Sequence, residues 1–128
     1  MNGRRVVCDT NVVLFLLKGD KVIAAALAGR ELVISQITRI ELLSFANISR
    51  TERKKIDLFL ETWSVESLHQ SIEDLTIELR KKHSCKLPDA VIAATASYLD
   101  IPLVTADKGL LRMNEEVEVV FYDPDQAQ

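Results

Sequence analysis

Apolar residues along the chain form short continuous runs, separated by longer stretches in which apolar and polar residues alternate at helical spacing. The runs predict buried strands at residues 5–8, 31–34, 101–104 and 117–122, with a possible shorter strand at 64–66. Because strands and helices alternate, right-handed crossovers should build a parallel sheet. The predicted fold class is α/β, with about five parallel strands and helices on both faces of the sheet.

Six helical segments are expected between these strands. They cover residues 12–17, 21–28, a segment that starts near 37, a segment from 51 to 63, 71–82 and 88–99. Thr10 and Asn11 precede the first segment and are expected to cap it. No internal repeat, low-complexity tract or linker interrupts the pattern, so residues 1–128 are expected to form one domain, with residues 123–128 as a frayed tail.

The stretch from Lys86 to Asp107 places two carboxylates at the ends of one helix-then-strand unit. Pro88 suits the first helical position, so Asp89 falls in the first turn. The helix that follows is almost entirely small and apolar, which predicts burial on most sides. Asp107 comes just beyond the carboxyl end of the next strand, which is the edge where open parallel sheets keep their chemistry.

Asp9 stands in the same position as Asp107, because it follows the first predicted strand directly. Each acid also has a purely structural interpretation. The helix macrodipole alone favours an acid in the first turn, as at Asp89, and Asp107 could simply cap the helical segment after it. A functional site requires further acids at the same place.

Glu41 is a candidate for such an acid. On a helix that starts near Ile37, the residues on the same face as Glu41 are Ile37, Ile40, Ser44 and Phe45, which predicts that Glu41 lies within a packed stripe. A buried carboxylate requires a cationic partner. That partner is either a basic side chain from elsewhere in the fold or a metal ion.

Composition narrows the class of protein. The chain is 48% hydrophobic and 27% charged, as in soluble globular proteins, and no apolar run is long enough to span a bilayer. The N-terminus does not form a signal peptide, because Asp9 interrupts its apolar run. Cys8 and Cys85 match neither a disulfide framework nor a metal-binding spacing. A cytoplasmic location with no membrane association is therefore expected. His69 and His83 are expected to be ordinary structural residues.

The net charge of −3 argues at first against a nucleic-acid partner. Setting aside four acids gathered in one site leaves +1 for the rest of the chain. Basic residues form two clusters, which are either solvated faces or a path for phosphates: Arg50, Arg53, Lys54 and Lys55, and Arg80, Lys81, Lys82 and Lys86.

Four carboxylates brought together repel one another unless a cation lies between them. The candidate set is Asp9, Glu41, Asp89 and Asp107. All of its ligands are hard oxygens, which favours Mg²⁺ or Mn²⁺ over zinc. Such an ion lowers the pKa of bound water and neutralises charge on a phosphodiester, which is the chemistry of a nuclease.

The same residues carry a family resemblance. The segments VVCDTNVVLFLL, ISQITRIELLSF, KLPDAVIAATA and LVTAD contain the four acids in order and span nearly the whole chain. In them the chain resembles PIN-domain proteins, most closely VapC-type toxin ribonucleases of toxin–antitoxin pairs. The resemblance implies a Mg²⁺- or Mn²⁺-dependent endoribonuclease acting on an RNA substrate, and a homodimer silenced by a cognate antitoxin.

The resemblance also assigns roles. It makes Asp9, Glu41, Asp89 and Asp107 the catalytic and metal-binding quartet, and gives supporting or substrate-orienting roles to Thr10, Asn11 and Thr105. One alternative is a PIN-like module that binds a partner and regulates transcription without cutting RNA. A phosphatase of the aspartyl-phosphate kind is excluded, because it needs an acid where this chain has Asn11. Transfer, messenger and ribosomal RNA all remain open as substrates.

Overall fold

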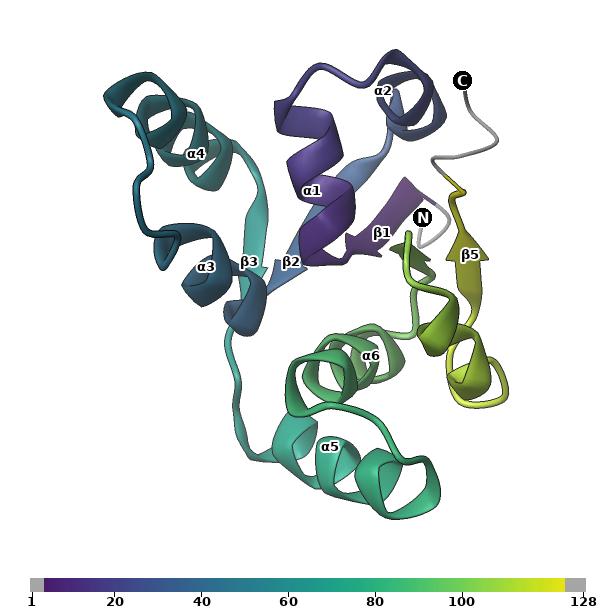
Figure 1. Cartoon of the computed structure of the whole chain (residues 1–128). Helices are drawn as coiled ribbons and strands as arrows, with labels where there is room; N and C mark the ends of the chain where they lie inside the picture. Colours follow the sequence, from purple (N-terminus) through teal and green to yellow (C-terminus); the bar gives the residue numbers. More distant parts are fainter. Residues whose placement is uncertain (1–3, 124–128) are drawn as a thin grey trace.

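The computed structural model describes residues 4–123, and within them it forms one five-stranded sheet with every neighbouring pair of strands parallel (Figure 1). The strand order is β3-β2-β1-β4-β5. The strands are β1 (Arg5–Cys8), β2 (Glu31–Ser35), β3 (Ser64–Glu66), β4 (Leu103–Thr105) and β5 (Val119–Phe121). The predicted α/β class and parallel sheet are confirmed. Residues 124–128, most of the expected tail, lie outside the described residues.

The predicted helices are present, with ends that differ by a few residues. They are α1 (Thr10–Leu17), α2 (Lys21–Leu27), α3 (Gln36–Leu43), α4 (Arg50–Thr62), α5 (Gln70–Lys82) and α6 (Leu87–Leu99). The segment after Asp107 forms a further, 3-10 helix, η2 (Lys108–Met113). No helix among residues 4–123 is long and apolar enough to cross a membrane. Cys8 and Cys85 are both free thiols, as expected.

Helices cover both faces of the sheet, and each face has its own hydrophobic core. Side chains alternate along β1, so that Val7 joins the core under α5, α6 and η2, while Val6 and Cys8 join the core under α1 to α4. Figure 1 shows α5 and α6 on one side of the sheet and α1, α2 and α4 on the other. The central strand β1 is therefore buried on both faces, and its carboxyl end opens directly at Asp9.

The last two strands are shorter than predicted. Pro102 has no N–H to give to the sheet, and its carbonyl accepts from Val7 N at 2.9 Å, so β4 starts only at Leu103. Val117 donates to the Met113 carbonyl and belongs to the turn after η2, which delays β5 to Val119.

Helix α6 confirms the prediction of a buried rod. Pro88 lies in its first turn, and all residues from Ala90 to Ala96 are buried. Small side chains allow α6 to pack closely between α5 and the sheet. The helix ends at Asp100, which adopts a left-handed conformation with φ of 55°. Asp89 is thereby held at the amino end of a helix that has little freedom to move.

The predicted burial of Glu41 within a packed stripe is wrong. The buried residues of α3 are Thr38 and Leu42, one helical turn apart, whereas Ile40 is 49% exposed and Phe45 is 42% exposed. The face of α3 that packs against the sheet is therefore the one with Thr38 and Leu42, next to the face predicted from the spacing. Glu41 lies at the edge of this packed face and is half-buried.

Candidate active site

The carboxyl ends of β1 and β4 open into a hollow of about 190 Å³. All four acids predicted from the sequence line this acidic hollow, together with Thr10 and Asn11. Its complete lining is Asp9, Thr10, Asn11, Leu14, Glu41, Phe45, Asp89, Ile92 and Asp107. The fold thus brings residues from four separate elements to one edge of the sheet.

Asp9 is the most buried of the acids, with 4% of its surface exposed. It is itself the N-cap of α1, so the expected capping by Thr10 and Asn11 is wrong: the helix begins two residues earlier than the apolar run suggests. Asp9 Oδ1 accepts from Val12 N at 2.9 Å, and Oδ2 accepts from the Thr105 hydroxyl. Burial raises the pKa of Asp9, and these hydrogen bonds counteract the rise.

Asp107 is connected to Asp9 through Thr105. The Thr105 hydroxyl donates to Asp9 and accepts from Asp107 N at 2.9 Å. Asp107 Oδ1 accepts from Gly109 N at 2.8 Å and caps η2. The capping interpretation is therefore correct for Asp107, but the cap uses only one carboxylate oxygen, and the residue still lines the acidic hollow.

Glu41 is held by a hydroxyl group. Thr10 donates to Glu41 Oε1 at 2.6 Å, and Thr10 Oγ1 also lies 3.1 Å from Thr38 Oγ1. Within residues 4–123 no lysine, arginine or histidine forms an ion pair with Glu41. The salt-bridge alternative for this carboxylate is thus not realised in the described part of the chain.

Asp89 shows that the four carboxylates act on one another. Burial is the largest cause of its raised pKa, followed by the negative charges of Asp107 and Asp9, while Lys86 lowers it and Glu41 raises it slightly. A cation in the acidic hollow would relieve all of these repulsions together.

The donor chemistry of the acidic hollow fits a hard divalent cation, because its charged groups are all carboxylates. Among residues 4–123, however, no three His, Cys, Asp or Glu side chains are arranged as a ready-made metal site. Asp9, Glu41 and Asp107 each give at least one oxygen to an internal donor. Since an ionised carboxylate has about four acceptor positions, these bonds leave capacity for a metal. Mutual repulsion explains why the oxygens share a hollow without meeting at one point.

Leu14, Phe45 and Ile92 also line the acidic hollow and were not predicted. Phe45 follows Glu41 by four residues, so the helical spacing already placed the two side by side. Leu14 and Ile92 are apolar residues of helices, and their local sequence looks the same as that of residues in the hydrophobic core, so it could not mark them as residues of the site.

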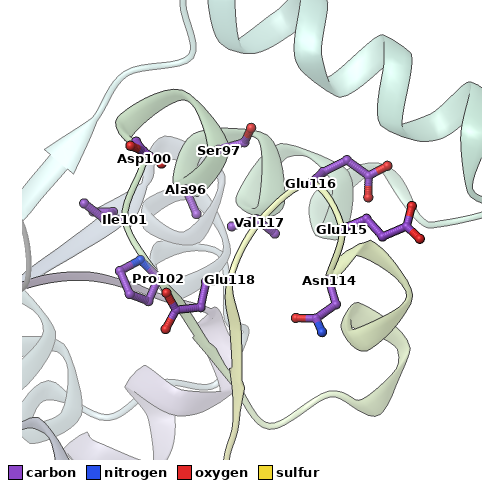
Figure 2. A pocket seen from close by; sticks show the side chains of 10 residues that line it. All are labelled: Ala96, Ser97, Asp100, Ile101, Pro102, Asn114, Glu115, Glu116, Val117 and Glu118. Atoms are coloured by element: carbon purple, nitrogen blue, oxygen red, sulfur yellow. The ribbon is translucent and has the colours of Figure 1, made fainter.

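A second hollow, of about 310 Å³, lies at the opposite edge of the sheet, before β4 and β5 (Figure 2). We call it the distal hollow. Acids are also gathered here, including Asp100, Glu115, Glu116 and Glu118. Glu116 is already paired, since its Oε2 lies 2.9 Å from Lys82 Nζ and 3.0 Å from His83 Nε2. These pairings give the distal hollow a structural explanation, and His83 is a structural residue, as expected.

Comparison with known protein families decides the classification. The model of the PIN domain family matches residues 6–116. The chain belongs to the PIN domain family. Proteins of this family are generally nucleases, which supports a hydrolase of the nuclease kind for this PIN domain. No curated protein matches the chain in sequence.

Solved structures share the fold of this PIN domain. A toxin–antitoxin complex from Klebsiella pneumoniae contains a chain 26% identical, with a TM-score of 0.73, and the match covers 90% of this chain and 95% of that one. VapBC2 from Rickettsia felis, bound to a DNA fragment from its promoter, matches at 19% identity and a TM-score of 0.81. The match covers 93% of this chain and 99% of that one. VapBC-5 from Mycobacterium tuberculosis matches at 21% identity and a TM-score of 0.68, and the match covers 93% of this chain and 99% of that one.

Proposed function

We propose that this PIN domain is the VapC-type toxin of a toxin–antitoxin pair and acts as a Mg²⁺- or Mn²⁺-dependent endoribonuclease. The observation that carries the proposal is the meeting of four carboxylates from separate elements in one hollow, where burial and the charges of the other acids raise the pKa of Asp89. Such an arrangement opposes folding stability and is typical of a functional site. The fold shared with chains of toxin–antitoxin complexes supports the biological role.

In this proposal Asp9, Glu41, Asp89 and Asp107 hold the cation. When bound, the ion supplies an activated water and neutralises negative charge on the phosphodiester. Thr105 and Thr10 orient the carboxylates of Asp9 and Glu41, because each hydroxyl donates directly to one of them. The exposed Asn11 lines the same hollow and is suited to contact the substrate.

The proposed partner is a cognate antitoxin. An apolar hollow of about 380 Å³, with lining residues from α1, α4 and the segment between α3 and α4, shares Leu14 and Phe45 with the acidic hollow. A segment with apolar side chains followed by a basic one could fill both hollows at once. The neighbouring structures are complexes of a toxin with an antitoxin, which supports this assignment.

The remaining features of the proposal are a single domain over residues 1–128, a homodimer and a cytoplasmic location. Light scattering of the purified protein tests the dimer. A mass near 14.4 kDa for the protein freed of its antitoxin would contradict it, since that is the mass of one chain.

The experiment that tests the nuclease compares three variants expressed from an inducible promoter. Wild-type protein is expected to arrest growth, and Asp9→Asn and Asp89→Asn are expected to relieve the arrest. Asp100→Asn is the matched control, because it makes the same chemical change at the other end of α6, in the distal hollow. Full toxicity of both site variants, at equal protein level, would contradict the proposal.

A second candidate function is a PIN-like module that binds and regulates together with its antitoxin but does not cut RNA. It is favoured by one observation: within residues 4–123 the acids do not form a ready-made metal site. This candidate predicts no Mn²⁺-dependent cleavage by protein freed of its partner. Cleavage that needs Mn²⁺, stops with EDTA and is lost in Asp9→Asn would exclude it.

A further inference from the structure

A basic hollow lies just before α6, the helix that carries Asp89 in its first turn. It has a volume of about 550 Å³ and is lined by Ile77, Arg80, Lys81, Ser84 and Cys85, at the end of α5 and in the loop before α6. Arg80 and Lys81 are exposed. Both lie in the last turn of α5, where the helix dipole favours positive charge, so their position alone does not indicate a ligand.

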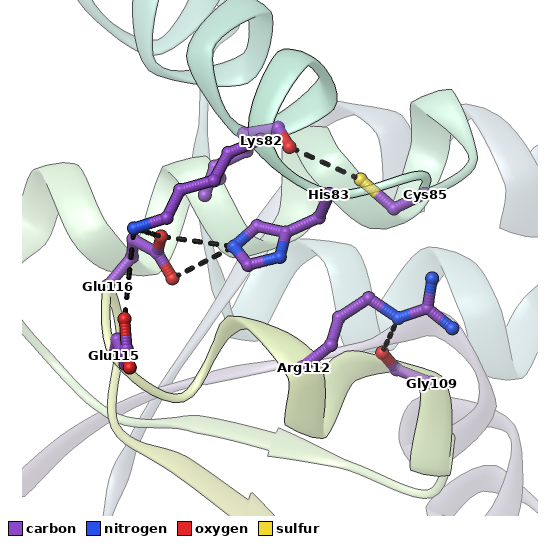
Figure 3. A network of polar contacts seen from close by, with 8 residues as sticks. Lys82, His83, Cys85, Gly109, Arg112, Glu115 and Glu116 are labelled. Atoms are coloured by element: carbon purple, nitrogen blue, oxygen red, sulfur yellow. Dashed lines mark hydrogen bonds and ion pairs between the residues drawn. The ribbon is translucent and has the colours of Figure 1, made fainter.

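Arg112 connects the basic hollow to the acidic one. Its Nε donates to the Gly109 carbonyl at 2.9 Å (Figure 3). Its Nη1 donates to the Ser84 carbonyl, also at 2.9 Å. Ser84 lines the basic hollow, and Gly109 N donates to Asp107 in the acidic hollow. A Cβ added at Gly109 would lie 3.1 Å from Asp107 Oδ1 and 3.9 Å from Arg112 Nη2. The guanidinium lines neither hollow itself, but it connects the loop of the basic hollow to the turn that holds Asp107.

The charge of Arg112 is not neutralised by an acid in the described part of the chain. Neighbouring Lys82 is different, because its Nζ lies 2.9 Å from Glu116, with Glu115 at 3.8 Å (Figure 3). Arg112 instead donates from Nε and Nη1 to neutral carbonyls, which fix the side chain. Its Nη2 has no hydrogen-bond partner among residues 4–123. An arginine side chain that is already held in place loses little further conformational entropy when it binds an anion.

We propose that Arg112 binds the RNA phosphate next to the one being cleaved, and that the phosphate backbone continues over Arg80 and Lys81. The inference rests on the proposed nuclease function. A net negative protein with an acidic site must attract RNA by local positive charge, and these residues supply it within reach of that site. Lys86, which lowers the pKa of Asp89, adds positive charge on the same side.

The other basic cluster is a weaker candidate for this path. It belongs to α4, on the other side of the molecule from α5 (Figure 1), and Arg53 is paired with Asp57 at 3.1 Å. Its Lys55 lines the apolar hollow, which we propose is filled by the antitoxin. Arg50 and Lys54 are exposed residues of this cluster and provide a charge-matched control.

The test measures binding of a fluorescein-labelled oligouridylate to the full chain, freed of antitoxin, by fluorescence anisotropy in EDTA over a range of salt concentrations. The variants are Arg112→Gln, Arg112→Lys, the double variant Arg80→Gln with Lys81→Gln, and the control Arg50→Gln with Lys54→Gln. We expect Arg112→Gln to weaken binding about tenfold, as a lost charge-assisted hydrogen bond allows. The slope of log K against log salt should fall by about 0.7 for each phosphate contact removed.

Arg112→Lys should restore part of the affinity, because the charge remains, although Lys lacks the planar fork that holds Arg112. A purely structural role would instead lower the melting temperature of both Arg112 variants and leave the salt slope unchanged. The exposed pair Arg80 and Lys81 keeps the test valid if Arg112 variants fold poorly.

The inference is overturned if Arg112→Gln and the α5 double variant bind like wild type, if the α4 control loses as much affinity, or if wild type shows no salt-dependent binding. The failure of the proposed function looks different. In that case binding shows the expected slopes, but wild-type protein does not cleave RNA when Mn²⁺ is added.

Discussion

The Thr10 hydroxyl donates to Glu41 Oε1 at 2.6 Å, which joins the first residue of α1 to α3 across 31 positions of the chain. Thr105 does the same for Asp9 from the end of β4. Two of the four acids are thus oriented by a threonine from a different element. A hydroxyl donor fixes the direction of a carboxylate without cancelling its charge, so both acids remain able to bind a cation.

Replacing Thr10 by Val removes the donor and keeps the shape of the side chain. We expect the affinity for Mn²⁺ and the cleavage rate to fall by about 10- to 100-fold, as found when such supporting groups are lost. Cleavage assays over a Mn²⁺ titration measure both effects. Thr10→Ser keeps the hydroxyl and serves as the control, and equal losses in the two variants would show that the methyl group matters instead.

Asp89→Asn should stabilise the metal-free protein at neutral pH. The folded-state pKa of Asp89 is raised, so the folded protein binds its proton more tightly than the unfolded chain, and stability falls as pH rises from the ordinary value of 3.8 through the raised pKa. Because this site is only half-buried, solvent screening should keep the gain in unfolding free energy small.

The comparison requires urea unfolding of both proteins in EDTA at several pH values. The difference between them should vanish below the ordinary pKa of Asp, where both side chains are neutral, and reach its full size above the raised pKa. A difference independent of pH would show that the repulsion among the acids is not its cause.

Divalent metal should reverse this order of stability. A ligand that binds only the folded state stabilises it by about 2.7 kcal/mol at a concentration of 100 times its Kd. Mn²⁺ is therefore expected to raise the melting temperature of wild type strongly and that of Asp89→Asn much less. An equal rise in both proteins would mean that the ion binds elsewhere.

Ala93→Leu should destabilise the fold and disturb the site together. Ala93 has no exposed surface and belongs to the core that also contains Ile72 of α5 and Val7 of β1. A larger side chain there must push α6 outward, at a cost of about 1–3 kcal/mol. Denaturant unfolding measures the loss of stability. Ser97→Leu, on a less buried position of the same helix, is the control and should cost less.

Much of the fold could be predicted because it follows from local patterns. Pro88 and the small apolar residues after it defined the start and the burial of α6, and the strand endings placed Asp9 and Asp107 at the same edge of the sheet. Parallel strands with alternating helices leave few possible topologies, so even the positions of distant acids relative to one another could be inferred.

The errors arose where tertiary packing decides. The spacing around Glu41 allowed two neighbouring stripes of α3 to face the core, and only the contacts with the sheet select the one that contains Thr38 and Leu42. The role of Arg112 has no local signal at all, because its partner Ser84 lies 28 residues earlier in the chain. Such a bond becomes visible only when both loops are placed in space.

The two thiols of this protein differ in exposure. Cys8 has no exposed surface, and burial together with the charge of Asp9 raises the pKa of its thiol, so it stays protonated and inert toward alkylating reagents. Cys85 is partly exposed beside Arg80 and Lys81. A maleimide dye added to the native protein should therefore attach at one position without any mutation, and its fluorescence would report directly on whatever occupies that part of the surface.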